Sequence, residues 1–392
     1  MDDKILEKIA ETQGTPAYVF NLDELSDRLE MIRKHLNGAA ELCYAMKANP
    51  FLIGHMGGLV ERFEVCSPGE YAICERAGIP ASKIVLSGVN KEYGEIEGVV
   101  ETAGGSTVYT IESEQHLQIL AECSGKKKEM LPVLIRLTSG NQFGIDEKAV
   151  CSMLERWDTY PYLEFRGIQF YSGTQKKNAA LMEKELKHLD AFCAELKERF
   201  QIEIPELEYG PGLCVSYFEK EEEDADREIL ESLAGMLKAM EFAGKITLEI
   251  GRYMAAHCGY YLTSIVDTKR NQDRNYCIID GGINHISYHG QIMAMKVPPH
   301  SHIPQKPEGG TEKWNVCGSL CTVADVLVKE LPLSGAGTGD LLIFKRIGAY
   351  SVTEGIYLFL SRNLPKVLFY SREGGVLVAR DTQPTYTINS KS

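Results

Sequence analysis

Lys47 is the residue whose type and surroundings most favour chemistry. It ends a short β-like run and is followed by small residues, in the segment 44–50, YAMKANP. A lysine in this position suits a buried amine that condenses with a carbonyl cofactor. Most lysines at strand ends are solvated, so the rest of the chain must supply groups that bind and steer such a cofactor.

Glycine-rich turns after other β-like runs can bind the phosphate of such a cofactor. Glycine lets the backbone approach closely, and successive N–H groups then form an anion-binding nest. The expected donors are Gly173 and Thr174 in one turn, and Gly210 and Gly212 in another. Arg252 can add a bidentate, charge-assisted contact to the phosphate.

Two further residues suit the ring of a pyridine-type cofactor such as pyridoxal 5′-phosphate. A carboxylate opposite the ring nitrogen raises the pKa of that nitrogen and keeps it protonated, which helps the ring accept electrons. Glu249 is the candidate carboxylate, and Tyr171 is placed to stack on the ring face. Each motif alone has an ordinary structural explanation, but the ordered set does not.

The elements that must position these residues form a regular series. β-rich runs alternate with amphipathic helical stretches and centre near residues 44, 65, 85, 108, 134, 168, 208 and 248. This predicts an α/β fold, a (β/α)8 barrel over 24–255, with a doubly wound open sheet as the alternative. Residues 1–23 and 256–392 are expected to form a β-rich, barrel-like domain that includes an N-terminal strand at 17–20.

Composition excludes several classes of function. A net charge of -13 argues against binding nucleic acid or acidic lipid headgroups. No apolar run is long enough to span a membrane, no signal peptide is evident, and the 11 cysteines are scattered, so we expect a cytoplasmic protein. Cys317 and Cys321 lack a second pair with zinc spacing, and no metal is expected.

These motifs, in this order from about residue 15 to 357, resemble the diaminopimelate/ornithine decarboxylase-like family of fold-type III pyridoxal-phosphate enzymes. The resemblance implies that Lys47 bonds the cofactor, Glu249 pairs with the ring nitrogen and Arg252 contacts the phosphate. The segment 348–350, GAY, resembles the phosphate-binding motif that ends in Tyr350. Racemases of this fold place an arginine beside the nitrogen, so Glu249 favours decarboxylation.

The resemblance also implies a proton donor and a dimer. The segment 317–325, CGSLCTVAD, resembles the family's cysteine motif, in which Cys321 reprotonates the substrate carbon. In family dimers this cysteine reaches the active site of the partner subunit, so a homodimer with shared active sites is expected. Substrate contacts are expected from Arg136, Thr322 and His285, although a structural turn explains the segment around His285 equally well.

Departures from the family pattern bear on the substrate. The residue after the donor cysteine is acidic in relatives that act on free diamino acids, where it meets the distal amine, whereas here it is Thr322. Other departures are Tyr171 and Gln169 at histidine positions, and Ile250 at a proline position. The pattern resembles a biosynthetic branch that decarboxylates conjugates in antibiotic or siderophore assembly.

The sequence therefore predicts a pyridoxal-phosphate-dependent lyase that decarboxylates an L-amino acid or its conjugate. A glutamyl group on an acyl-carrier protein is the leading substrate, which makes that carrier protein a possible partner. The alternatives are a siderophore intermediate or a free diamino acid. A non-catalytic pyridoxal-phosphate-binding homologue is an alternative of another class, although such proteins usually lose the lysine or the cysteine.

Overall fold

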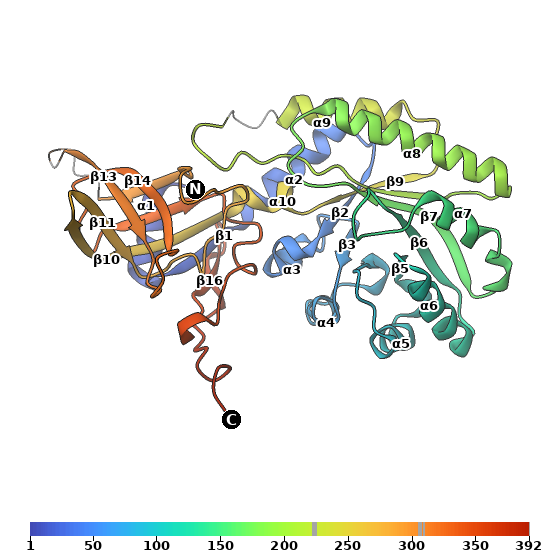
Figure 1. Ribbon diagram of the computed structural model, residues 1–392, viewed down its shortest axis with the longest axis horizontal. Coiled ribbons are helices and arrows are strands. Elements are labelled where there is room, and N and C mark those ends of the chain that lie inside the picture. The colour runs from blue at the N-terminus through green and yellow to red at the C-terminus, as the bar shows by residue number, and fades with distance from the viewer. Residues whose placement is uncertain (222–225, 305–307, 309, 392) are drawn as a thin grey trace. The chain divides into compact units, whose positions relative to one another are not determined.

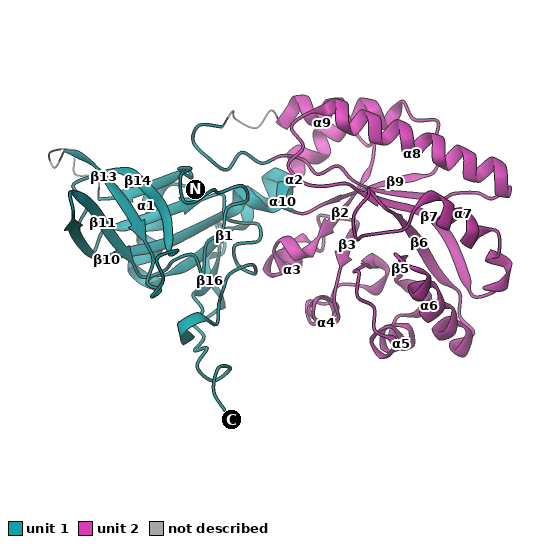
Figure 2. Cartoon of the chain, viewed as in Figure 1, with its two compact units in different colours: residues 1–28, 215–224, 252–392 teal, residues 29–214, 225–251 magenta. Residues whose placement is uncertain are grey.

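The computed structural model describes residues 1–221, 226–304, 308 and 310–391 and divides into two compact units (Figure 2). The barrel unit comprises Leu29–Cys214 and Ala225–Gly251, and the β-rich unit comprises Met1–Arg28, Val215–Asp224 and Arg252–Ser392. The sequence assigned 24–255 to the barrel. The structure instead groups 24–28, 215–224 and 252–255 with the β-rich unit.

The barrel unit contains a closed ring of eight parallel strands in chain order, which confirms the predicted barrel (Figure 1). The strands are β2 (Glu41–Ala45), β3 (Arg62–Val65), β4 (Ile84–Leu86), β5 (Val108–Ile111), β6 (Leu131–Leu137), β7 (Leu163–Tyr171), β8 (Glu206–Gly210) and β9 (Lys245–Ile250). The ring closes where Cys43 of β2 pairs with Glu249 of β9. Active-site residues of such barrels gather at the carboxyl ends of the strands.

Helices connect successive strands, and several of them begin at polar caps. They are α2 (Leu22–Leu36), α3 (Ile53–Met56), α4 (Pro68–Arg76), α5 (Tyr93–Thr102), α6 (Glu114–Lys127), α7 (Glu147–Leu154), α8 (Ala179–Phe200) and α9 (Asp226–Lys238). Ser67 caps α4 by accepting a hydrogen bond from the Glu70 N–H, and Asn178 caps α8 through Ala180. Such caps satisfy N–H groups that have no partner inside the helix.

The β-rich unit is built on a nine-stranded mixed sheet, which confirms a β-rich second domain. Its strands are β1 (Ala17–Asn21), β10 (Gly259–Asn271), β11 (Arg274–Ile279), β12 (His300–Ile303), β13 (Thr311–Cys317), β14 (Val326–Ser334), β15 (Leu341–Lys345), β16 (Lys366–Ser371) and β17 (Gly375–Arg380). Strand β1 lies between β10, which is antiparallel to it, and β16, which is parallel. Helix α1 (Asp3–Gln13) packs Leu6 and Ile9 into the core beside this sheet, and the short helix α10 (Arg252–Ala255) precedes β10.

Candidate active site

Lys47 lies in a 3₁₀ turn, Met46–Ala48, directly after β2. Its Nζ lies 2.5 Å from Glu64 Oε2 of β3 and 3.4 Å from Glu249 Oε1 of β9. The Lys47 side chain is 40% exposed, whereas the side chains of Glu64 and Glu249 are 0% and 8% exposed. Barrel closure therefore places an accessible amine between two carboxylates fixed in the wall.

The pKa values of the two carboxyl groups are shifted in opposite directions. Burial favours the neutral form of Glu64, but the charge and hydrogen bond of Lys47 outweigh it and lower the pKa of Glu64 to about 2. Burial and the neighbouring Glu64 charge raise the pKa of Glu249 to about 7, although Lys47 opposes the shift. Glu64 is therefore the main counter-ion of Lys47, and Glu249 can still pair with another cation.

A second buried carboxyl group, Glu208 of β8, lies in the same polar interior. Gln169 Nε2 donates to Glu208 Oε1 over 2.6 Å. Burial and the Glu249 charge raise the pKa of Glu208 to about 8. Neither Glu64 nor Glu208 is assigned a role by the sequence motifs. The available signal was a glutamate flanked on both sides by large apolar or aromatic residues, Phe63 and Val65 in β3 and Leu207 and Tyr209 in β8.

The two glycine-rich turns after β7 and β8 pack backbone against backbone. Gly212 has φ +62°, and a Cβ there would lie 1.9 Å from the Gly173 carbonyl oxygen. A Cβ at Gly210 would lie 2.6 Å from Cδ2 of Tyr171, the last residue of β7. Only glycine permits these approaches. The structure thus brings Tyr171, Gly173, Thr174, Gly210 and Gly212 together at the carboxyl ends of β7 and β8.

Arg252 and Tyr350 lie together in the β-rich unit. The Arg252 guanidinium carbon is 4.3 Å from the centre of the Tyr350 ring, and Nη1 donates to the Tyr217 hydroxyl over 3.2 Å. Arg252 Nε is buried and has no hydrogen-bond partner among the described residues. An unsatisfied buried donor fits an anionic ligand.

Cys321 is exposed on a loop that follows β13. The buried carboxylate of Asp325 accepts hydrogen bonds from the N–H groups of Leu320, over 2.8 Å, and Ile283, over 2.9 Å. These bonds fix the base of the loop while leaving the thiol accessible. Thr322, the adjacent residue, is half-buried.

His285 is enclosed in the β-rich unit and is 3% exposed. Its Nδ1 lies 2.9 Å from the Tyr261 hydroxyl and its Nε2 lies 3.0 Å from Asn284 Nδ2. Burial lowers the pKa of His285 to about 4. Both ring nitrogens thus have protein partners, so we leave His285 out of the proposed substrate contacts and regard it as a structural residue of this turn.

Arg136, the other expected substrate contact, lies in the barrel and is 9% exposed. Its Nη1 lies 3.5 Å from Glu112 Oε2, and its guanidinium carbon lies 5.0 Å from the centre of the Phe143 ring. Its positive charge lowers the pKa of both Glu64 and Glu249, although burial and Lys47 act more strongly on them. Arg136 therefore contributes to the same electrostatic environment as Lys47.

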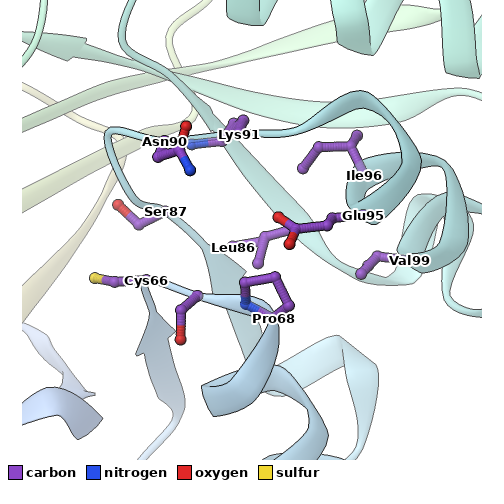
Figure 3. A pocket seen from close by; sticks show the side chains of 10 residues that line it. Cys66, Pro68, Leu86, Ser87, Asn90, Lys91, Glu95, Ile96 and Val99 are labelled. Carbon is purple, nitrogen blue, oxygen red and sulfur yellow. The ribbon is translucent and has the colours of Figure 1, made fainter.

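A small cavity of about 20 Å³ lies beside Cys66, between the segments that follow β3 and β4. Figure 3 shows its lining, which combines apolar side chains such as Pro68 and Leu86 with Ser87 and Asn90. This volume holds about one water molecule. The cavity is too small to be the substrate site.

The described residues meet neither the requirements for a metal site nor those for a membrane-spanning helix. Within the described ranges, no group of three or more His, Cys, Asp or Glu side chains is placed to hold a metal ion. Among the described helices, none is long and apolar enough to cross a membrane.

Comparison with known proteins adds a family and several relatives. Residues 22–256 match the family described as pyridoxal-dependent decarboxylase, pyridoxal binding domain. The chain is 26% identical to the L-glutamyl-[BtrI acyl-carrier protein] decarboxylase of Niallia circulans, over 90% of this chain and 87% of the relative. It is 27% identical to the diaminopimelate decarboxylase of Aquifex aeolicus, over 88% and 84% of the two chains.

A further relative is the 2-[(L-alanin-3-ylcarbamoyl)methyl]-2-hydroxybutanedioate decarboxylase of Staphylococcus aureus, which is 25% identical over 91% of this chain and 94% of the relative. Among solved structures, the crystal structure of AQ1208 from Aquifex aeolicus superposes with a TM-score of 0.84 and 25% identity. That similarity covers 98% of this chain and 93% of the other.

Proposed function

The chain belongs to the pyridoxal-dependent decarboxylases, and on that premise we propose that it decarboxylates a conjugated L-amino acid, with a carrier-bound glutamyl group as the leading substrate. Because the matched family consists of pyridoxal-dependent decarboxylases and the named relatives are decarboxylases, the protein is a carboxy-lyase that uses pyridoxal 5′-phosphate. A non-catalytic binding role is therefore set aside.

The residues of the barrel unit fit this cofactor. When bound, pyridoxal 5′-phosphate supplies an aldehyde that condenses with an amine and a ring that accepts the electron pair left by carbon dioxide. We assign the amine to Lys47, which must first lose a proton, and Glu64 beside it is a strong acceptor of its hydrogen bonds. We assign Glu249 to the ring nitrogen, as the resemblance of its segment to the family motif implies, and its buried carboxylate lies in the same barrel wall as the Lys47 site.

The phosphate and the ring face have their own candidates. We assign the phosphate to the turns of Gly173, Thr174, Gly210 and Gly212, together with Arg252 and Tyr350. The support is the close packing of the two turns and the unsatisfied Arg252 Nε. Tyr171, packed on Gly210, is assigned to the ring face.

Thr322 is the observation that carries the substrate proposal. A threonine cannot neutralise the distal ammonium of a free diamino acid, and a buried cation without a partner binds poorly. A glutamyl group held through its carbonyl on a carrier has no such ammonium. The relative from Niallia circulans acts on such a conjugate. The siderophore intermediate and free diaminopimelate remain the alternatives, supported by relatives of similar identity.

Release of carbon dioxide from carboxyl-labelled substrates tests this choice. We expect kcat/KM for a glutamyl-loaded carrier protein to exceed that for diaminopimelate by at least about 10²-fold. The control is Thr322→Asp, which is expected to shift the preference towards diaminopimelate. The proposal fails if wild-type protein decarboxylates the free diamino acid more efficiently, or if no conjugated amino acid releases carbon dioxide.

Cys321 is proposed as the acid that reprotonates the substrate carbon, in a homodimer where each subunit lends this loop to its partner. Cys321→Ala is expected to leave the absorbance of bound cofactor intact and to slow decarboxylation by about 10²-fold, with some turnover diverted to transamination. Cys317→Ala, four residues earlier and half-buried, is the matched control. Unchanged kinetics in Cys321→Ala would remove this thiol from the mechanism.

A further inference from the structure

Glu185 on helix α8 is a buried carboxylate on which three hydrogen-bond donors converge. Lys176 Nζ lies 2.7 Å from Oε2, the Tyr209 hydroxyl donates to the same oxygen over 2.6 Å, and the Ser172 hydroxyl donates to Oε1. The Lys176 and Glu185 side chains are 5% and 10% exposed, and Tyr209 is fully buried. Nothing in the cofactor assignments above accounts for this cluster.

The cluster holds one of the two glycine-rich turns. In the connection between β7 and α8, Gly173 and Thr174 lie between Ser172 and Lys176. Because Glu185 accepts hydrogen bonds from the side chains of both Ser172 and Lys176, it holds this turn at its two ends. The Lys176 N–H also donates to the Gly212 carbonyl over 2.8 Å, which links the turn to the one after β8. Tyr209, at the end of β8, ties the same carboxylate to the second turn.

The charges in the cluster explain why a carboxylate is needed. The Lys176 ammonium is nearly inaccessible to water, and Glu185 is the anion within salt-bridge distance of it. Burial and the Glu185 charge raise the pKa of Tyr209 well above its usual value, so its hydroxyl stays a donor. An uncharged replacement at position 185 loses the counter-ion while keeping similar volume.

We propose that Glu185 is a positioning residue that holds the 172–176 turn in the shape that binds the cofactor phosphate. The inference rests on the assignment of the phosphate to Gly173 and Thr174 made above. Glu185 itself touches neither cofactor nor substrate. Its effect is on the affinity for the phosphate group, separate from the covalent capture of the aldehyde by Lys47.

The experiment compares pyridoxal 5′-phosphate with pyridoxal, which keeps the aldehyde and lacks the phosphate. Dissociation constants are measured by absorbance titration of wild-type protein and Glu185→Gln. We expect the constant for the phosphate form to rise at least about tenfold, and the constant for pyridoxal to change less than about twofold. Glu183→Gln, an exposed neighbour on the same helix that pairs with Lys187, is the matched control and should match wild type.

A double variant, Glu185→Gln with Lys176→Met, removes both buried charges and keeps the proposal testable if the single variant does not fold. It should fold and still bind the phosphate form weakly. Equal weakening for both ligands, or wild-type affinity in either variant, overturns the proposal. If wild-type protein itself binds the two ligands equally, the phosphate assignment fails together with this inference. Both dissociation constants are measured without substrate, so an error in the proposed substrate would not change them.

Discussion

Replacing Lys47 with alanine is expected to abolish the visible absorbance of covalently bound pyridoxal 5′-phosphate and to lower decarboxylation by more than about 10³-fold. The reason is that the Lys47 amine is the one we assign to the cofactor, and it lies between Glu64 and Glu249 at the carboxyl end of β2. Absorbance spectra and carbon dioxide release measure the two effects.

Lys47→Arg is the matched control for this prediction. Arginine keeps a cation beside Glu64 and Glu249, but it cannot lose its proton to react with an aldehyde. We expect Lys47→Arg to fold like wild type and to lack the absorbance band. A band that persists in Lys47→Ala would show that another lysine carries the cofactor.

Glu249→Gln is expected to slow decarboxylation by about 10²-fold while leaving covalent cofactor binding intact. An amide cannot hold a proton on the ring nitrogen as a carboxylate does, so the ring accepts electrons less well. The control is Glu208→Gln, because Glu208 is another buried carboxyl group whose pKa is raised. This variant should have a smaller effect on turnover. Wild-type turnover in Glu249→Gln would contradict the assigned role.

Glu249→Gln, which is expected to slow turnover, is expected to stabilise the folded protein at alkaline pH. Burial and Glu64 raise the pKa of Glu249 from 4.5 to about 7 in the folded protein. The folded state thus binds the extra proton between these values, and the contribution of Glu249 to stability falls as pH rises from about 4.5 to 7. We expect cofactor-free Glu249→Gln to lack this loss and to melt at a higher temperature than wild type at pH 8.

The sequence predicted the barrel well because its strands are short apolar runs buried on both faces. All eight expected strand centres lie in or beside an observed strand. In the β-rich domain the sequence pattern did not single out β12 (His300–Ile303), β13 or β14, and the histidines and serine of β12 lack the apolar alternation of a strand. Packing extends beyond the last strand, where Thr385 is buried and donates to the Arg362 carbonyl. Residue 392 lies outside the described residues.

The candidate site was harder to predict because its pairings are long-range. Lys47 and Glu249 could be singled out by type, but the contact of Lys47 with Glu64 depends on how β2 and β3 are paired. Glu185 gave no local signal, since a glutamate in a polar helix is ordinary until the helix is placed on the barrel. His285 shows the reverse, because its side chain suggested chemistry while its burial makes it structural.

The pairing of β1 with β16 has a consequence for synthesis of the protein. Residues 17–21 leave the ribosome long before their parallel partner, residues 366–371, has been made. Strand β10 can pair with one edge of β1 beforehand, while the other edge stays open until residues 366–371 have been made. An open strand edge is a template for aggregation. Truncated chains that end before residue 366 should therefore aggregate even when their barrel has closed.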